Sequence, residues 1–342
     1  MKRLLTLLII LFTGMLGTSF AHAADTPANA LLILAKQDGI LLIVDPSSLQ
    51  VIARVPVGKD PHEVIASSDG RTAYASNYGS GAYNTLAVVD LTAQKALPSV
   101  ELGALRGPHG LTFAGGKAWF TAEGAKAIGS YDPATKNVDW ILGTGQNRTH
   151  MIYVSPDMKT IVTTNVSSGT VSIIEKAAGG SPGQGSALGA PGGDWNETVV
   201  RVGDGSEGFD VSADGKEIWV ANAGDGTVSI INVASKRVTE TLAADVRGAN
   251  RLKFTPDGKL ALISTLRGSD VTVIDTATHK TVKRIAVGHG AAGIQMQPDG
   301  GRAFVACSPD GYVAVIDLHS LEVAGRIEAG HDPDGLAWAT RQ

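Results

Sequence analysis

The sequence is poor in the residues on which several classes of protein depend. Only one of its 342 residues is a cysteine, Cys307, so no disulfide can form within the chain and stability must come from packing. Acidic residues outnumber basic ones, and without residues 1–23 the chain keeps 27 basic and 33 acidic side chains. This balance offers little attraction to the phosphates of nucleic acid, which we therefore do not expect as a partner.

Long hydrophobic runs are also missing, apart from one near the N-terminus. That run, residues 4–16, is shorter than the roughly 18 residues that span a bilayer, so no membrane span is expected. Two basic residues precede it and the small-residue sequence Ala21-His22-Ala23 follows it, which is the order of a secretory signal. Residues 1–23 are thus predicted to be a signal peptide, and the mature chain, 24–342, is predicted to be periplasmic or secreted.

A repeat of about 43 residues runs through the mature chain. An acidic or amide residue closes a β-branched run seven times, at Asp45, Asp90, Asp132, Glu175, Asn232, Asp275 and Asp317. A second series marks the start of another strand, also seven times, at His62, His109, His150, Glu207, Asn250, Ala292 and Asp334. Such a period is typical of four-stranded units arranged radially, and it predicts an all-β, seven-bladed β-propeller with antiparallel strands in each blade.

The order of the two series predicts how the ring closes. Asp45 comes before the first strand start, at His62, and Asp334 comes after the last closing residue, at Asp317. One blade must therefore be shared between the two ends of the chain. Closing the ring in this way removes the open sheet edges that would invite aggregation.

The unit from Glu207 to Ala244 shows the plan of one blade, with four short strands and three tight turns. Turns such as Asp214-Gly215 supply the positive φ that hairpins need. A single insertion interrupts the rhythm, at 176–197, and its Gly, Pro, Ser and Ala predict a flexible surface loop between the third and fourth strands of its blade. Trp195, near its end, is expected to pin the loop to the sheet.

Several motifs carry a resemblance to a known family. They are Ser155-Pro156-Asp157, Thr255-Pro256-Asp257-Gly258, Trp219-Val220-Ala221-Asn222, Val273-Ile274-Asp275-Thr276 and Ile285-Ala286-Val287-Gly288. With these motifs the chain resembles the bacterial YVTN-repeat (YncE-like) β-propellers, which are secreted and surface-layer proteins. The resemblance covers nearly all of the mature chain and implies the propeller fold. It implies no particular activity, because propellers host unrelated functions.

The strand starts place most histidines on one face of the expected ring. His62, His109 and His150 begin the innermost strands of three adjacent blades, while His331 lies in a loop just before such a strand. Imidazoles projecting into a narrow hub can supply nitrogen ligands to Cu or Zn. We therefore take those three residues as candidate metal ligands. Two weaker candidates, Asp334 and His331, stand beside them, and Glu123, Lys36 and Arg267 are expected in turns of the same face. A polar hub that holds no metal is the alternative interpretation.

The sequence is compatible with two functions. The first is a binding platform, with a protein or small-molecule ligand on the face that carries the three histidines. The second is an enzyme of lactonase or lyase type centred on the hub, with or without a metal, in which Glu207 would face His62 or His109 as the candidate catalytic residue. The sequence contains no nucleophile motif, phosphate-binding loop or haem-binding motif, so catalysis is the less favoured of the two.

Overall fold

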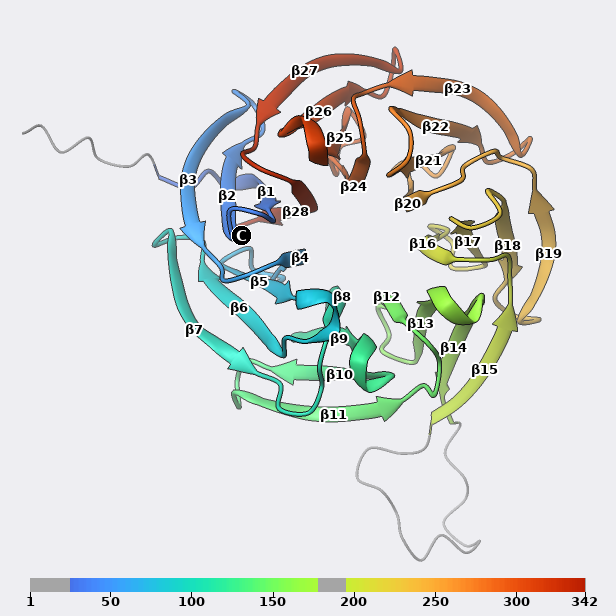
Figure 1. The fold of residues 1–342 in the computed structure, drawn as a ribbon, viewed down its shortest axis with the longest axis horizontal. Helices are drawn as coiled ribbons and strands as arrows, with labels where there is room; N and C mark the ends of the chain where they lie inside the picture. Colours follow the sequence, from blue (N-terminus) through green and yellow to red (C-terminus); the bar gives the residue numbers. More distant parts are fainter. Residues whose placement is uncertain (1–24, 178–194, 342) are drawn as a thin grey trace, which may run out of the picture.

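The computed structural model describes residues 25–177 and 195–341. Within these ranges the chain forms seven antiparallel sheets of four strands each, arranged as blades around a common centre (Figure 1). The predicted all-β, seven-bladed propeller is therefore confirmed. The predicted signal peptide and most of the predicted insertion lie outside the described residues. No helix in the described ranges is long and apolar enough to cross a membrane.

The strands of a blade follow one another from the centre of the ring outward, with the blade at the chain ends as a special case. The innermost strands are β4 (Pro61–Ala66), β8 (Pro108–Ala114), β12 (Thr149–Val154), β16 (Ser206–Val211), β20 (Ala249–Phe254), β24 (Ala291–Met296) and β28 (Pro333–Thr340). The second strands are β1 (Asn29–Ala35), β5 (Thr72–Asn77), β9 (Lys117–Ala122), β13 (Thr160–Asn165), β17 (Glu217–Asn222), β21 (Leu260–Thr265) and β25 (Arg302–Cys307).

The outer half of each blade is built in the same way. The third strands are β2 (Ile40–Asp45), β6 (Thr85–Asp90), β10 (Ala127–Asp132), β14 (Thr170–Lys176), β18 (Val228–Asn232), β22 (Asp270–Asp275) and β26 (Tyr312–Asp317). The outermost strands are β3 (Gln50–Pro56), β7 (Lys95–Glu101), β11 (Asn137–Gly143), β15 (Trp195–Arg201), β19 (Arg237–Leu242), β23 (Lys280–Ala286) and β27 (Glu322–Glu328). In the described ranges, four 3-10 turns join second to third strands: η1 (Gly79–Gly81), η2 (Glu123–Ala125), η3 (Val166–Ser168) and η4 (Ser308–Asp310).

The two ends of the chain share one blade, as the order of the markers predicts. Strand β28 pairs antiparallel with β1, and this sheet has the order β28-β1-β2-β3. The pairing places Trp338 opposite Leu31 and Leu336 opposite Ile33. The C-terminal strand thus supplies the innermost strand of the blade that the N-terminal strands build, and the ring is closed (Figure 1).

Burial follows the position of a strand in its blade. The second and third strands are buried over most of their length, as in β1 and β2, because they lie between neighbouring blades. The outermost strands alternate or are largely exposed, and β7 is exposed at six of its seven positions. The lone cysteine, Cys307, is fully buried at the end of β25, in the apolar cluster that joins two blades. Packing of β-branched and leucine side chains between blades is thus the main source of stability.

The ends of the insertion differ from the expected bounds of 176–197. Lys176 still belongs to β14 and pairs with Trp195, where β15 begins, so both blade strands extend into the segment that composition assigned to a loop. The ring of Trp195 lies 5.4 Å from that of Trp140 on the adjacent blade, and its side chain packs against an apolar cluster. Trp195 therefore lies on the sheet, as the expected anchor would, whereas residues 178–194, the loop itself, lie outside the described residues.

Each innermost strand is interrupted near its start by a register irregularity. On β4 the pairing with β5 skips from Pro61 to Val64, and on β8 the pairing with β9 skips from Pro108 to Leu111. The same irregularity recurs in the other five blades. Two residues per innermost strand are thus released from the regular ladder. Irregularities of this kind change the direction of side chains. Here they allow side chains of the released residues to project into the centre of the ring.

Candidate functional site

One position of each blade faces the centre of the ring, on the side that carries the 3-10 turns. It is the second residue of the innermost strand and the first of the two released residues. We call these seven residues the hub ring: His62, His109, His150, Glu207, Asn250, Ala292 and Asp334. They are the seven strand starts expected from the sequence, so the predicted equivalence of the three histidines is confirmed.

Hydroxyl groups of the second strands hold the backbone of the hub ring in place. Ser76 donates a hydrogen bond of 2.8 Å to the carbonyl oxygen of His109, and Thr121 donates one of 2.7 Å to that of His150. Thr164 does the same for Glu207 at 2.9 Å. Each bond joins a blade to the next one along the chain. The hub side chains are therefore held by inter-blade contacts, which limits their movement.

The three histidines of the hub ring lie together. The ring centroids of His62 and His109 are 5.0 Å apart, and those of His109 and His150 are 3.9 Å apart. His109 and His150 are almost completely buried. Burial, together with the positive charges of His150 and other neighbours, lowers the pKa of His109 well below its usual value, so this imidazole is neutral. Its Nδ1 atom is buried and has no hydrogen-bond partner within the described part of the chain.

His150 lies between two carboxylates. Its Nδ1 atom is 2.5 Å from Oε1 of Glu123, and its Nε2 atom is 2.9 Å from Oε1 of Glu207, although the second contact lacks good hydrogen-bond alignment. Burial alone would lower the pKa of His150, but the charge of Glu207 and the contacts with both carboxylates raise it to about 9. Burial likewise opposes ionisation of Glu207, yet His150 and nearby arginines lower its pKa to about 2. At neutral pH the site therefore holds an imidazolium between carboxylates.

Two further side chains complete this cluster. The hydroxyl of Tyr78 donates a 2.6 Å hydrogen bond to Oε2 of Glu123, and its pKa is raised to about 12, mainly by burial and then by this bond. Arg148, which is partly exposed, lies 3.6 Å from Glu123 and 3.7 Å from Glu207 and so bridges the two carboxylates. The sequence places Glu123 on this face but gives no sign that it pairs with His150. The contact depends on how far η2 reaches over the next blade.

The weaker candidates separate into one residue near the cluster and one away from it. Asp334 lies 3.5 Å from Nδ1 of His62 and accepts a 3.2 Å hydrogen bond from Nζ of Lys36. His331, in contrast, is about three-quarters exposed, and its imidazole contacts Asp38 at 2.8 Å. The structure brings Asp334 to the histidines through His62, but it does not bring His331 there.

One group of ligating atoms in the described residues has the spacing of a possible metal site. It comprises His109, Glu123 and His150, whose ligand atoms all lie within 4.8 Å of one another. Two imidazole nitrogens and a carboxylate oxygen suit Zn or Cu. This set replaces His62 of the expected trio by Glu123. A metal ion bound here would have to displace the proton of His150.

The fold and this polar centre define a seven-bladed β-propeller with a histidine-rich hub. Within it, residues 192–302 match the model of the YNCE-like beta-propeller family, which confirms the predicted resemblance over this part of the chain. A search of curated proteins found no match.

Solved structures of the same fold span nearly the whole chain. A protein of unknown function from Desulfotomaculum acetoxidans is 13% identical, with a TM-score of 0.75, over 92% of this chain and 100% of its own. A protein from Bacteroides fragilis, named as a candidate 6-phosphogluconolactonase, is 14% identical, with a TM-score of 0.70, over 92% and 99%. Hydrazine synthase of Kuenenia stuttgartiensis is 19% identical, with a TM-score of 0.65, over 81% and 89%. At these identities the likeness shows the fold alone.

Proposed function

We propose that this protein is an exported binding platform whose ligand occupies the mouth of the ring formed by His62, His109, His150, Glu123 and Glu207. The observation that carries the proposal is the buried Nδ1 atom of His109, which has no partner among the described residues. An unsatisfied buried polar atom costs about 1–3 kcal/mol, and a ligand that contacts it removes that cost. Export is supported by the signal-like N-terminus of the sequence.

A divalent transition-metal ion is the ligand that this geometry favours. The donor set of His109, His150 and Glu123 combines nitrogen and oxygen atoms that suit Zn or Cu. Tyr78 hydrogen-bonds to Glu123 and so orients the carboxylate, as the outer partners of metal ligands commonly do. When bound, the ion would replace the proton on His150 as the positive charge between the carboxylates.

The test is metal uptake by mature, untagged protein. After dialysis against Zn or Cu at pH 8, we expect about one equivalent of metal per chain by elemental analysis, and its loss in His109→Ala. His331→Ala is the matched control, because His331 is an exposed histidine of the same face that lies outside the cluster. Protein that takes up no metal rejects the metal ligand, and uptake that survives His109→Ala places the ion elsewhere.

Binding is better supported than catalysis by Glu207. A general base should have a pKa near the working pH, whereas the pKa of Glu207 is lowered to about 2 and its carboxylate is paired with His150. The lactonase or lyase alternative would therefore have to use another proton acceptor. Turnover of a lactone that disappears in Glu207→Gln would overturn this argument.

A further inference from the structure

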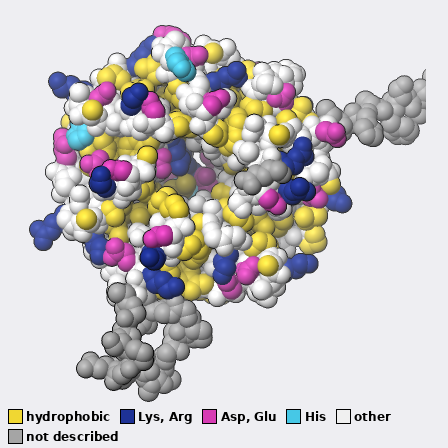
Figure 2. Space-filling model, turned by 180° about the vertical axis from the view of Figure 1, so that it is seen from behind, with side chains coloured by type: hydrophobic (Ala, Val, Ile, Leu, Met, Phe, Trp, Pro, Cys, Tyr) yellow, Lys and Arg dark blue, Asp and Glu magenta, His cyan; other side chains and the backbone are white. Residues whose placement is uncertain are grey.

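A second polar site lies on the opposite side of the ring, separated from the histidines by an ion pair. Glu63 and Arg251 each follow a hub residue, and their side chains meet across the centre. Both are buried, and Arg251 also donates a 3.0 Å hydrogen bond to the carbonyl of Asn250. Figure 2 shows the face behind this pair, which is hollowed at its centre, with hydrophobic side chains around the hollow and charged side chains inside it.

The hollow is a cavity of about 320 Å³, which we call the back funnel. Its volume falls within the range of roughly 300–1,000 Å³ that small-molecule sites occupy. Its lining includes aromatic side chains although aromatic residues are only 5% of the chain: Phe113, Tyr153, Phe209 and Trp338. The funnel is therefore large enough for a small ligand and distinct from the histidine cluster.

Along each innermost strand, two successive positions differ in polarity in most blades. The residue two places after the hub residue is apolar in all seven blades, and all of these residues except Leu252 line the funnel: Val64, Leu111, Ile152, Phe209, Leu252, Ile294 and Leu336. The next residue, which also lines the funnel, is polar in five consecutive blades: Thr112, Tyr153, Asp210, Lys253 and Gln295. The remaining two blades carry Ile65 and Ala337 there. These five polar side chains are only partly buried, so a molecule in the funnel can reach them in front of the apolar wall.

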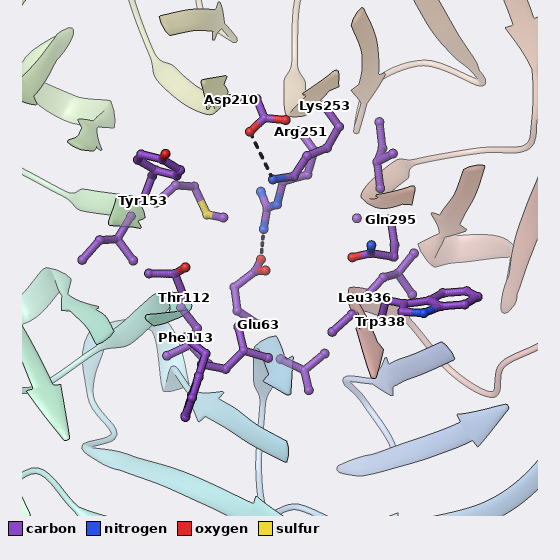
Figure 3. A pocket seen from close by; sticks show the side chains of 18 of the residues that line it. Glu63, Thr112, Phe113, Tyr153, Asp210, Arg251, Lys253, Gln295, Leu336 and Trp338 are labelled. Atoms are coloured by element: carbon purple, nitrogen blue, oxygen red, sulfur yellow. Dashed lines mark hydrogen bonds and ion pairs between the residues drawn. The ribbon is translucent and has the colours of Figure 1, made fainter. Parts of the chain in front are cut away.

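Several of these polar groups are fixed in place and leave capacity for a ligand (Figure 3). Asp210 accepts backbone hydrogen bonds of 3.1 Å from Val211 and 3.0 Å from Phe254, which hold its carboxylate. The amide nitrogen of Gln295 donates to the carbonyl of Met296 at 2.7 Å, so its oxygen is the atom left to accept.

The remaining polar groups can donate hydrogen bonds, and the two hydroxyls among them can also accept. Lys253 is partly exposed and lies 3.8 Å from Asp210, a distance that leaves its ammonium available to another acceptor. Across the described ranges, the hydroxyls of Thr112 and Tyr153 show no hydrogen-bond partner.

The charges of the funnel cancel. Two carboxylates, Glu63 and Asp210, face two cations, Arg251 and Lys253, so there is no net attraction for an ion. The uncharged groups offer both donors and acceptors, which matches a ligand whose own groups do both. Hydroxyl groups have this property, and the apolar side chains of the wall suit the carbon skeleton that bears them. We propose that the back funnel binds a small, uncharged, polyhydroxylated molecule of monosaccharide to disaccharide size.

The test is calorimetric titration of the full mature chain with glucose, galactose, ribose and maltose, and with glucuronate and free tryptophan as charged and zwitterionic alternatives. We expect saturable binding of at least one neutral sugar. Tyr153→Phe and Thr112→Val each remove one hydroxyl at nearly constant shape and should weaken it by about 3- to 10-fold. Tyr83→Phe, a tyrosine exposed elsewhere on the surface, should not change it.

The outcomes of these experiments distinguish this proposal from the proposed metal binding at the histidine cluster. Metal uptake should be unchanged in Tyr153→Phe and Thr112→Val, because the ion pair of Glu63 and Arg251 lies between the two sites. The proposal is overturned if no neutral sugar binds, or if sugar binding is the same in both variants as in the parent protein. Preferential binding of glucuronate or tryptophan would also overturn it, since the funnel would then select charge.

Discussion

The side chains of Glu63 and Arg251 form an ion pair across the centre of the ring, although 188 residues separate them in the chain. Each occupies the position directly after a hub residue. In four of the other five blades that position is glycine, and in the fifth it is Met151. The single acid and the single base of this set of positions therefore face each other across the centre.

Removing one partner of this pair should destabilise the protein strongly. Arg251→Met leaves the buried Glu63 carboxylate without its cation, and we expect a loss of about 3–5 kcal/mol in the free energy of unfolding. Replacing both residues, in Glu63→Met with Arg251→Met, should restore much of the loss, because no unpaired charge remains buried. Urea unfolding of the two single variants and the double variant gives the comparison.

An exposed pair provides the control for that experiment. Lys216 and Asp214 contact each other at 2.9 Å on the surface, and Lys216→Met should leave the unfolding free energy almost unchanged, because water screens an exposed pair. If Arg251→Met changed the free energy of unfolding as little as this surface variant, the buried pair would not contribute to stability.

The histidine cluster should make stability depend on pH in the alkaline range. The pKa of His150 is raised from 6.5 to about 9 in the folded protein. Its contribution is therefore fully present below about pH 6.5 and is lost as the pH rises through about 9. In protein freed of metal with a chelator, the free energy of unfolding should fall between pH 7 and 10, by about 3 kcal/mol at most. The fall should be much smaller in His150→Gln, which does not titrate there. Parallel pH profiles for the two proteins would contradict the raised pKa.

The hub ring could be predicted from the sequence because it depends on local signals. Turn residues and β-branched runs mark where each innermost strand begins, and seven repeats of the same pattern fix which residues are equivalent. His62, His109 and His150 could thus be placed together from their positions in the repeat. Asp334 belongs to the same ring by the same reasoning.

The partners of those residues could not be predicted in the same way. The contact between Glu123 and His150 depends on the reach of a turn from one blade over the next, and the pair of Glu63 and Arg251 depends on the width of the ring. Neither distance is encoded in the spacing of residues along one strand. The sequence did contain a signal for the second pair. At the position directly after each hub residue, Glu63 and Arg251 are the only residues that are not glycine or methionine.

Closure of the ring by β28 should be essential for folding. A chain that stops before Pro333 loses the innermost strand of the shared blade and exposes the edge of β1, so we expect aggregation or a large fall in melting temperature. A chain that stops after Thr340 keeps β28; among the described residues it loses Arg341, with its hydrogen bonds to the carbonyls of Ala28 and Thr26, so its melting temperature should change little. Circular dichroism during heating compares the two. Similar melting of both truncated chains would show that the ring does not need its C-terminal strand.

Close approach of neighbouring blades at the hub should make Gly335 difficult to replace. A Cβ atom at this position would lie 2.3 Å from the carbonyl oxygen of His62 and 2.9 Å from Cα of Glu63. Because both neighbours are backbone atoms, Gly335→Ala can be accommodated only by moving the two blades apart, at a cost of about 1–3 kcal/mol or more. Gly143→Ala is the matched control, since a Cβ there meets no atom within 4 Å. Urea unfolding should show a clear loss for Gly335→Ala and almost none for Gly143→Ala. Because the displaced strand carries His62, Gly335→Ala should also disturb the histidine cluster. Equal stability of the two variants would mean that the blades are less tightly packed than these distances require.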